Sequence, residues 1–88
     1  MPELCRFDGI TIHMYSEPTT PHKLPHLHAY YQDMQAIVSL DGFLLSGDLP
    51  SRKLAALQVW IEKRKEELME DWELLLIGKP FKKISPLK

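Results

Sequence analysis

Residues 36–46 read AIVSLDGFLLS, in which the dipeptide Asp41-Gly42 separates two apolar runs. Asp-Gly is favoured in tight β-hairpins because a two-residue type I′ turn needs positive φ at both central positions. The stretch therefore predicts two antiparallel strands, over 36–40 and 43–46, joined by this turn.

The same alternation of polar and apolar residues extends the predicted sheet toward the N-terminus. Residues 7–15 alternate with the period of a half-buried strand, and residues 26–31 do the same. The segment between them, 16–25, carries three prolines, which lack a backbone donor and restrain the residue before them. We expect an irregular loop there. Together these patterns predict a small antiparallel β-meander of three to four strands.

From residue 51 the hydrophobic period becomes helical. Apolar residues recur at spacings of three, four and seven, and they are Leu54, Leu57, Ile61, Leu68, Trp72 and Leu75. Arg64 occupies the one gap in this stripe, inside the fully charged run 63–67. The pattern favours one long C-terminal helix over residues 50–78, with a kink or break in the charged run as the alternative.

The predicted fold class is α+β, with the meander packed on the helix. Eighty-eight residues, of which 44% are hydrophobic, suffice for one core, so we expect a single domain over 1–88. Its expected parts are a sheet layer (1–49) that contains the Pro/His-rich loop (16–25), the helix (50–78) and a basic tail (79–88).

Composition excludes several classes of function. A net charge of -1 argues against a general polyanion binder, and the single Cys5 excludes an intramolecular disulfide framework. Cys5 is expected to be a small buried residue and not a nucleophile. No apolar run approaches the roughly 20 residues of a membrane span, and no secretory signal is visible. We therefore expect a cytoplasmic protein without membrane contact.

The densest group of chemistry-bearing residues is the stretch PHKLPHLHA at 21–29, which holds three histidines within seven residues. In an extended strand, His26 and His28 project from one face about 6.5–7 Å apart, and Tyr30 continues their row. This pattern predicts a histidine patch on one face of the sheet.

Antiparallel pairing with the first strand would bring His13 beside this row, and the proline-rich loop would fold His22 over it. Three chemistries suit such a cluster. No cofactor is expected, although the four histidines could bind a divalent metal. His26 and His28 could act as the general acid and base of a metal-independent ribonuclease. The patch, including His22 and Tyr30, could instead bind a protein partner. A purely structural interpretation also fits, since His and Tyr suit a half-exposed strand face.

Basic residues outside the sheet could complete a ribonuclease site by holding the phosphates of RNA. The candidates for this role are Arg64, Lys82 and Lys83. The acidic positions of the helix predict a solvated surface, with i,i+4 pairing to neighbouring basic residues. The residues expected to face water are Glu66, Glu67, Glu70 and Asp71.

Short motifs run through nearly the whole chain, and they are Met1-Pro2, Phe7, Gly9-Ile10, Pro25-His26, His28-Ala29, Tyr31, Gly47, Leu49-Pro50, Arg52, Trp60, Glu67-Leu68, Trp72, Gly78, Pro80, Lys83-Ile84 and Pro86-Leu87. In this combination the chain resembles a prokaryotic family called domain of unknown function 4160. The family usually reads Pro-Pro-His-Phe-His-Ala where this chain has LPHLHA at 24–29. Many relatives also carry a histidine where this chain has Arg64.

The resemblance implies a small bacterial protein, often encoded beside a partner called domain of unknown function 2442. That arrangement is typical of a two-gene module of the toxin–antitoxin type. No catalytic mechanism comes with the resemblance. We therefore expect a protein-interaction component whose partner is the product of an adjacent gene. A histidine-dependent ribonuclease-like toxin and a metal-binding protein are the alternatives.

Overall fold

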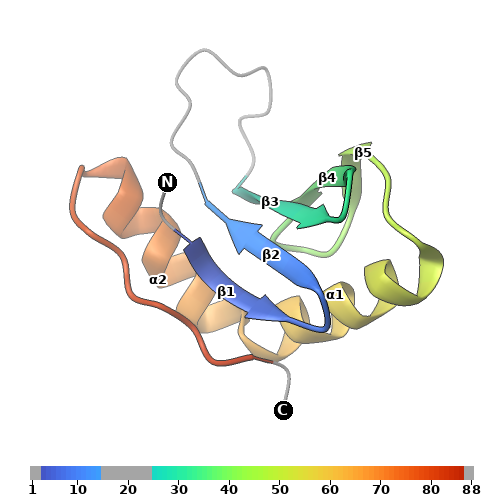
Figure 1. Cartoon of the computed structure of the whole chain (residues 1–88). Coiled ribbons are helices and arrows are strands. Elements are labelled where there is room, and N and C mark those ends of the chain that lie inside the picture. Colours follow the sequence, from blue (N-terminus) through green and yellow to red (C-terminus); the bar gives the residue numbers. More distant parts are fainter. Residues whose placement is uncertain (1–2, 15–24, 87–88) are drawn as a thin grey trace.

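The computed structural model describes residues 3–14 and 25–86 of the chain, in which five strands are followed by two helices (Figure 1). The elements are β1 (Glu3–Phe7), β2 (Ile10–His13), β3 (His26–Tyr31), β4 (Met34–Ser39), β5 (Leu44–Gly47), α1 (Ser51–Lys63) and α2 (Lys65–Leu76). The α+β class is as predicted, but the sheet has five strands instead of three to four. The predicted loop, 16–25, lies outside the described residues except for Pro25.

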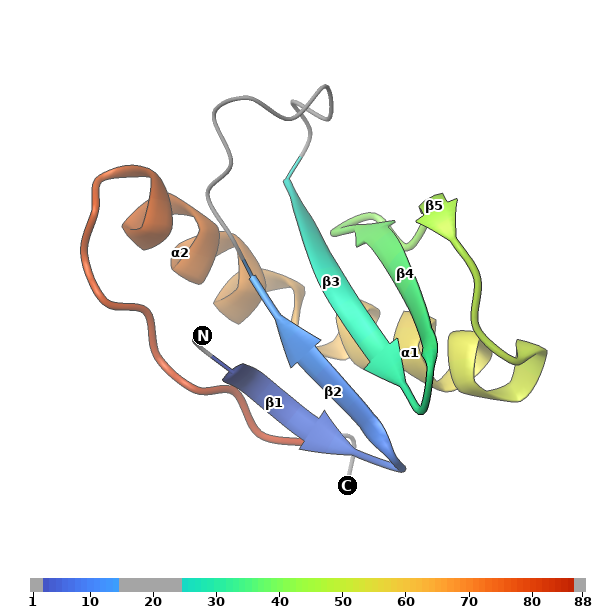
Figure 2. The ribbon, with the colours of Figure 1, turned by 45° about the horizontal axis from the view of Figure 1, so that its top comes forward.

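The strands form one antiparallel meander in the order β1-β2-β3-β4-β5. In its register Ile12 lies opposite Ala29, and Leu27 lies opposite Val38. Because side chains alternate across a strand, this register gathers apolar residues on one face. Both helices lie behind that face (Figure 2). The core between the two layers includes Ile10, Ile12, Leu27 and Val38 of the sheet, with Leu57, Trp60, Ile61 and Leu68 of the helices.

The additional strand, β1, arises from a turn inside the segment predicted as a single strand over 7–15. Asp8 and Gly9 both have positive φ, of 55° and 80°. This is the pattern of a type I′ turn, and it folds β1 back onto β2 with Phe7 opposite Ile10. The prediction was wrong here because the alternating pattern of residues 10–14 continues into residues 7–9, although Asp8 and Gly9 form a turn.

The hairpin predicted from Asp41-Gly42 is present, but its turn is of another type. Only Gly42 of this dipeptide has positive φ, of 92°. Its N–H donates to the carbonyl of Ser39 at 2.9 Å, and the N–H of Ser39 donates to the carbonyl of Phe43 at 2.8 Å. The loop is therefore longer than the predicted two-residue turn, with a left-handed glycine at its end.

Two helices replace the single long helix predicted over 50–78. They meet at Arg64, the gap in the apolar stripe, where the backbone has φ of -111° and ψ of 19°. The Arg64 N–H still donates to the carbonyl of Trp60, and the Leu68 N–H donates to that of Arg64, both at 2.9 Å. The alternative of a break within 63–67 is thus correct, and it costs few backbone hydrogen bonds.

After α2 the chain turns at Gly78 and runs back past the helices toward β1 (Figure 2). The N–H of Ile84 donates to the carbonyl of Leu4 at 3.1 Å. The indole Nε1–H of Trp60 donates to the carbonyl of Ser85 at 2.8 Å. Ile84 itself is buried in the core. The tail therefore covers the β1 edge of the sheet, and β5 forms the opposite edge.

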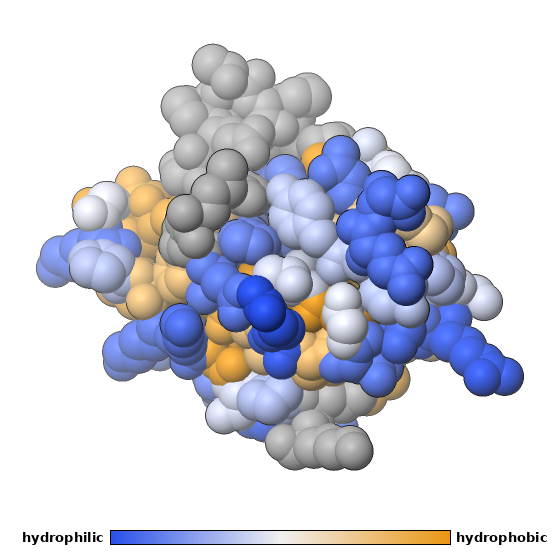
Figure 3. All heavy atoms as spheres, viewed as in Figure 1, coloured by the Kyte–Doolittle hydropathy of each residue, from blue (hydrophilic) through white to orange (hydrophobic). Residues whose placement is uncertain are grey.

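The surface is mixed in character. In Figure 3 hydrophilic residues cover most of the face shown, and hydrophobic residues gather on the left, over α2. Leu76 and Ile77, at the end of that helix, are among the exposed large apolar residues. Among residues 3–14 and 25–86, no helix combines the length and the apolar character that crossing a bilayer requires.

Gly47, at the end of β5, lies close to the neighbouring strand, and this yields a first prediction. Its φ is 74°, and a Cβ added there would overlap the backbone oxygen of Gln35. Gly42 has a comparable φ of 92° but open space around it. We expect Gly47→Ala to lower the free energy of unfolding by about 2–3 kcal/mol and Gly42→Ala by about 1 kcal/mol, because only the first adds a steric clash. Urea unfolding followed by circular dichroism measures both, and equal losses would contradict the close approach.

Candidate functional site

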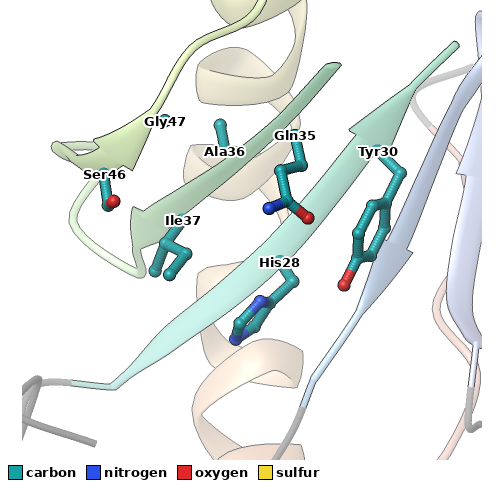
Figure 4. Close-up of a pocket in the computed structure, with 7 residues that line it drawn as sticks. All are labelled: His28, Tyr30, Gln35, Ala36, Ile37, Ser46 and Gly47. Atoms are coloured by element: carbon teal, nitrogen blue, oxygen red, sulfur yellow. The ribbon is translucent and has the colours of Figure 1, made fainter. Parts of the chain in front are cut away.

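The face of the sheet that the helices leave open carries the predicted histidine patch. Pairing of β2 with β3 places His13 directly opposite His28. Figure 4 shows His28, Tyr30 and Gln35 projecting on the same side of the sheet, away from the helix behind it. By register, two rows of residues cross this face, and they are His13–His28–Ile37–Ser46 and Thr11–Tyr30–Gln35.

A shallow concavity of about 250 Å³ opens on this face between β3, β4 and β5. The residues that line it are His28, Tyr30, Gln35, Ala36, Ile37, Ser46 and Gly47 (Figure 4). The described residues of its lining mix aromatic, amide, hydroxyl and apolar groups, with no Asp, Glu, Lys or Arg among them. Its volume is below the roughly 300–1,000 Å³ of typical small-molecule sites. The surface is therefore better suited to contact with a polypeptide than to enclosing a metabolite.

His26 differs from the other histidines of the patch. It is 1% exposed, and its ring centroid lies 5.2 Å from that of Trp72 on α2 and 5.6 Å from that of His28. His13 and Tyr30 form an edge-to-face pair at 5.4 Å and remain partly exposed. The proposed acid–base role of His26 with His28 stays a prediction, but a bound substrate would meet His13, His28 and Tyr30 first.

The expected metal site is not assembled by the part of the chain that the structure describes. Within residues 3–14 and 25–86, no group of three or more His, Cys, Asp or Glu side chains is placed to hold a metal ion. His26 packs against Trp72 of α2, with its ring centroid 5.6 Å from that of His28, and His13 lies opposite His28 in the register. His22, the fourth predicted ligand, lies outside the described residues.

The basic residues predicted to hold phosphate lie away from the concavity. Arg64 sits at the junction of the helices, where Nη1 lies 3.4 Å from Glu67 and Nη2 lies 3.4 Å from the carbonyl of Pro86. The Lys82 ammonium lies 3.3 Å from Glu70. Lys83 lines a second cavity, between α2 and the tail. The structure therefore does not bring these side chains together with His28.

Asp71 is a residue whose environment the sequence prediction missed. It was expected to face water, but it is 1% exposed. Its Oδ1 accepts the backbone N–H of Lys82 at 2.9 Å, whereas Oδ2 has no hydrogen-bond partner among the described residues. Asp71 follows Leu68 by three positions and precedes Trp72, so the helical period already placed it at the edge of the buried stripe.

Burial raises the pKa of the Asp71 carboxyl above its usual value. The hydrogen bond from the Lys82 N–H opposes this effect, while the nearby charges of Glu70 and Glu67 add to it. Burial also raises the pKa of the Cys5 thiol, which the structure encloses in the core. The prediction that Cys5 is a small buried residue is confirmed.

The raised pKa of Asp71 predicts how stability changes with pH. A carboxyl whose pKa is higher in the folded state stabilises the fold below its usual pKa, and this stabilisation is lost as pH rises through the folded pKa. Asn is neutral throughout, so we expect the stability of Asp71→Asn relative to the wild type to rise as the pH increases from about 4. Urea unfolding across this range measures the difference. Glu73→Gln, an exposed neutralisation on the same helix, should give a flat difference; the same slope for both variants would contradict the assignment.

Comparison with known proteins identifies the family to which the chain belongs. One family model matches residues 9–73, which is most of the 88-residue chain. The match runs from the turn after β1 through most of α2 and includes the open sheet face. No curated protein and no solved structure is detectably similar. The chain therefore belongs to the family described as Domain of unknown function (DUF4160), in agreement with the resemblance of its motifs.

Proposed function

We propose that this protein is the protein-binding component of a bacterial two-gene module of the toxin–antitoxin type, and that it binds its partner by accepting a strand at β5. The observation that carries the proposal is the difference between the two edges of the sheet. β1 is covered by the C-terminal tail through the bond from Ile84 to Leu4. On the outer side of β5, no strand of the described residues is paired.

An uncovered edge strand presents backbone donors and acceptors that a second chain can satisfy. Proteins that bind by strand addition use this property, with main-chain hydrogen bonds supplying affinity and alternate side chains supplying specificity. β5 spans only Leu44–Gly47, so the added segment would be short. A short edge also limits indiscriminate pairing, which favours a partner with additional side-chain contacts.

Such contacts are available beside the edge. Phe43 is 70% exposed and Leu44 is 40% exposed, at the start of β5. Burial of an aromatic side chain in an interface contributes a large share of binding energy, and large apolar residues without a packing role often mark such surfaces. These two side chains would pack against the partner where its strand begins or ends.

The concavity continues from the same edge across the open face. Ser46 of β5 lies opposite Ile37, which in turn lies opposite His28. A strand added beside β5 would direct every second side chain over this row. The partly exposed side chains of His28 and Tyr30 would then contact the partner's side chains. This gives the histidine patch a role in recognition that requires neither a metal ion nor a chemical step.

The partner is the product of an adjacent gene, as the family resemblance implies. To test this, both proteins are co-expressed and analysed by size-exclusion chromatography, and the affinity is measured by calorimetry. We expect Leu44→Lys and Ser46→Lys to raise Kd about tenfold or more, because a charged edge disfavours strand addition.

Val59→Lys is the matched control. Val59 is 46% exposed, close to the value for Leu44, but it lies on α1 and not on the sheet. We expect its Kd to stay within about twofold of the wild type, well under the 1.4 kcal/mol of a tenfold change. Two separate chromatographic peaks at micromolar concentration would remove the proposal. Equal effects of the Leu44 and Val59 variants would remove the β5 edge as the binding surface.

A further inference from the structure

A second cavity lies between α2 and the C-terminal tail. It measures about 240 Å³. The residues that line it are Glu67, Glu70, Asp71, Lys82, Lys83 and Ile84. Three carboxylates from α2 therefore face two lysines and one apolar residue from the tail. None of the roles discussed above uses this cavity.

The decisive feature of this cavity is the carboxylate of Asp71. Asp71 is almost completely buried, and its Oδ1 is occupied by the backbone N–H of Lys82. Oδ2 has no hydrogen-bond partner within the described residues. A buried polar atom left without a partner costs about 1–3 kcal/mol, and more when the group is charged. Oδ2 is itself enclosed, so a ligand reaches it only when the tail beside Asp71 shifts; a hydrogen bond donated to Oδ2 would then recover that cost.

The carboxylates beside Asp71 favour a cationic ligand. Their present ion pairs with basic side chains can break, so that they can bind the ligand instead. Glu67 is paired with Arg64 at 3.4 Å, and Glu70 with Lys82 at 3.3 Å. Both contacts are long, and the Lys82 side chain is 78% exposed. Exposed ion pairs of this kind contribute little to stability, so they exchange readily. The Lys82 ammonium can swing into water while its backbone N–H remains bound to Asp71.

The chemistry points to an organic cation and not to a metal ion. No group of three or more metal-ligating side chains is assembled in the described part of the chain. A guanidinium group is planar, carries five donors and is less strongly hydrated than an ammonium group. It can donate to Oδ2 of Asp71 and to a neighbouring carboxylate at the same time. Ile84 offers an apolar contact for the methylene stem that carries such a group.

We propose that the cavity between α2 and the tail binds a guanidinium group, carried by an arginine side chain of a polypeptide or by a free guanidino compound. The Asp71 carboxylate is the primary acceptor, and Glu67 or Glu70 is the second. This site is independent of strand addition at β5.

The backbone amide of Lys82 reports on the site, because it is bonded to the Asp71 carboxylate. The ¹⁵N-labelled full-length protein is titrated with N-acetyl-arginine methylamide, and separately with N-acetyl-citrulline methylamide, which has the same shape without the charge. We expect the arginine probe to shift the Lys82 amide signal in a saturable manner and the citrulline probe to leave it unchanged. Equal shifts with both probes would overturn the proposal.

Two variants locate the binding. Asp71→Asn removes the primary acceptor charge and should weaken binding of the arginine probe about tenfold or more. Lys82→Gln changes only an exposed side chain, removes the competing ammonium and should tighten binding a few-fold. Glu73→Gln, which lies on the same helix but does not line the cavity, should have no effect. Unchanged affinity in both the Asp71 and the Lys82 variants would overturn the proposal.

A third titration distinguishes the two sources of the ligand. Methylguanidinium carries the charged group without a peptide backbone. Binding as tight as that of the arginine probe supports a free guanidino compound, and binding about tenfold weaker supports an arginine side chain in a polypeptide. No binding by either cation overturns the site, whatever the outcome of the β5 experiments.

Discussion

The structure depends on the burial of one face of a five-stranded sheet against two helices. Ile10 and Leu27 on the sheet, with Trp60 and Leu68 on the helices, belong to one continuous core. Each fully buried side chain of this size contributes roughly 1.5–3 kcal/mol, which a chain of this length needs to offset its conformational entropy. Since this one layer of helices covers only one face, the opposite face and its polar side chains are left open. The candidate site is a direct consequence of this arrangement.

The tail makes the two edges of the sheet unequal. The bond from Ile84 to Leu4 covers β1, and the bond from Trp60 to Ser85 fixes the tail against the helices. The chain thereby covers one edge with its own backbone, whereas no strand of the described residues pairs with the outer side of β5. The same tail encloses Asp71 and forms the cavity beside it. One irregular segment of the chain thus determines both which edge is open and where a carboxylate is buried.

The histidines of the patch lie in different environments. His13 and His28 face each other across β2 and β3 on the open face. His26 is buried and packs on Trp72 of α2. A strand period places alternate residues on one face, but it does not show which of them a helix from the other layer will reach at the end of a strand. Among the described residues, the open face therefore presents His13 and His28 with Tyr30.

The sequence by itself determined the α+β class, the hairpin around Asp41-Gly42 and the charged run 63–67 in which the helix could break. These features follow from local periodicity, from Asp-Gly turn chemistry and from a charge in an apolar stripe, which act between residues close in the chain. Only the tertiary structure decided that Asp71 and His26 are buried and that one sheet edge is covered while the other is not. Each depends on a segment distant in sequence, such as Lys82 for Asp71 or Ile84 for β1. Burial and hydrogen-bond partners arise from three-dimensional packing, and no local pattern encodes them.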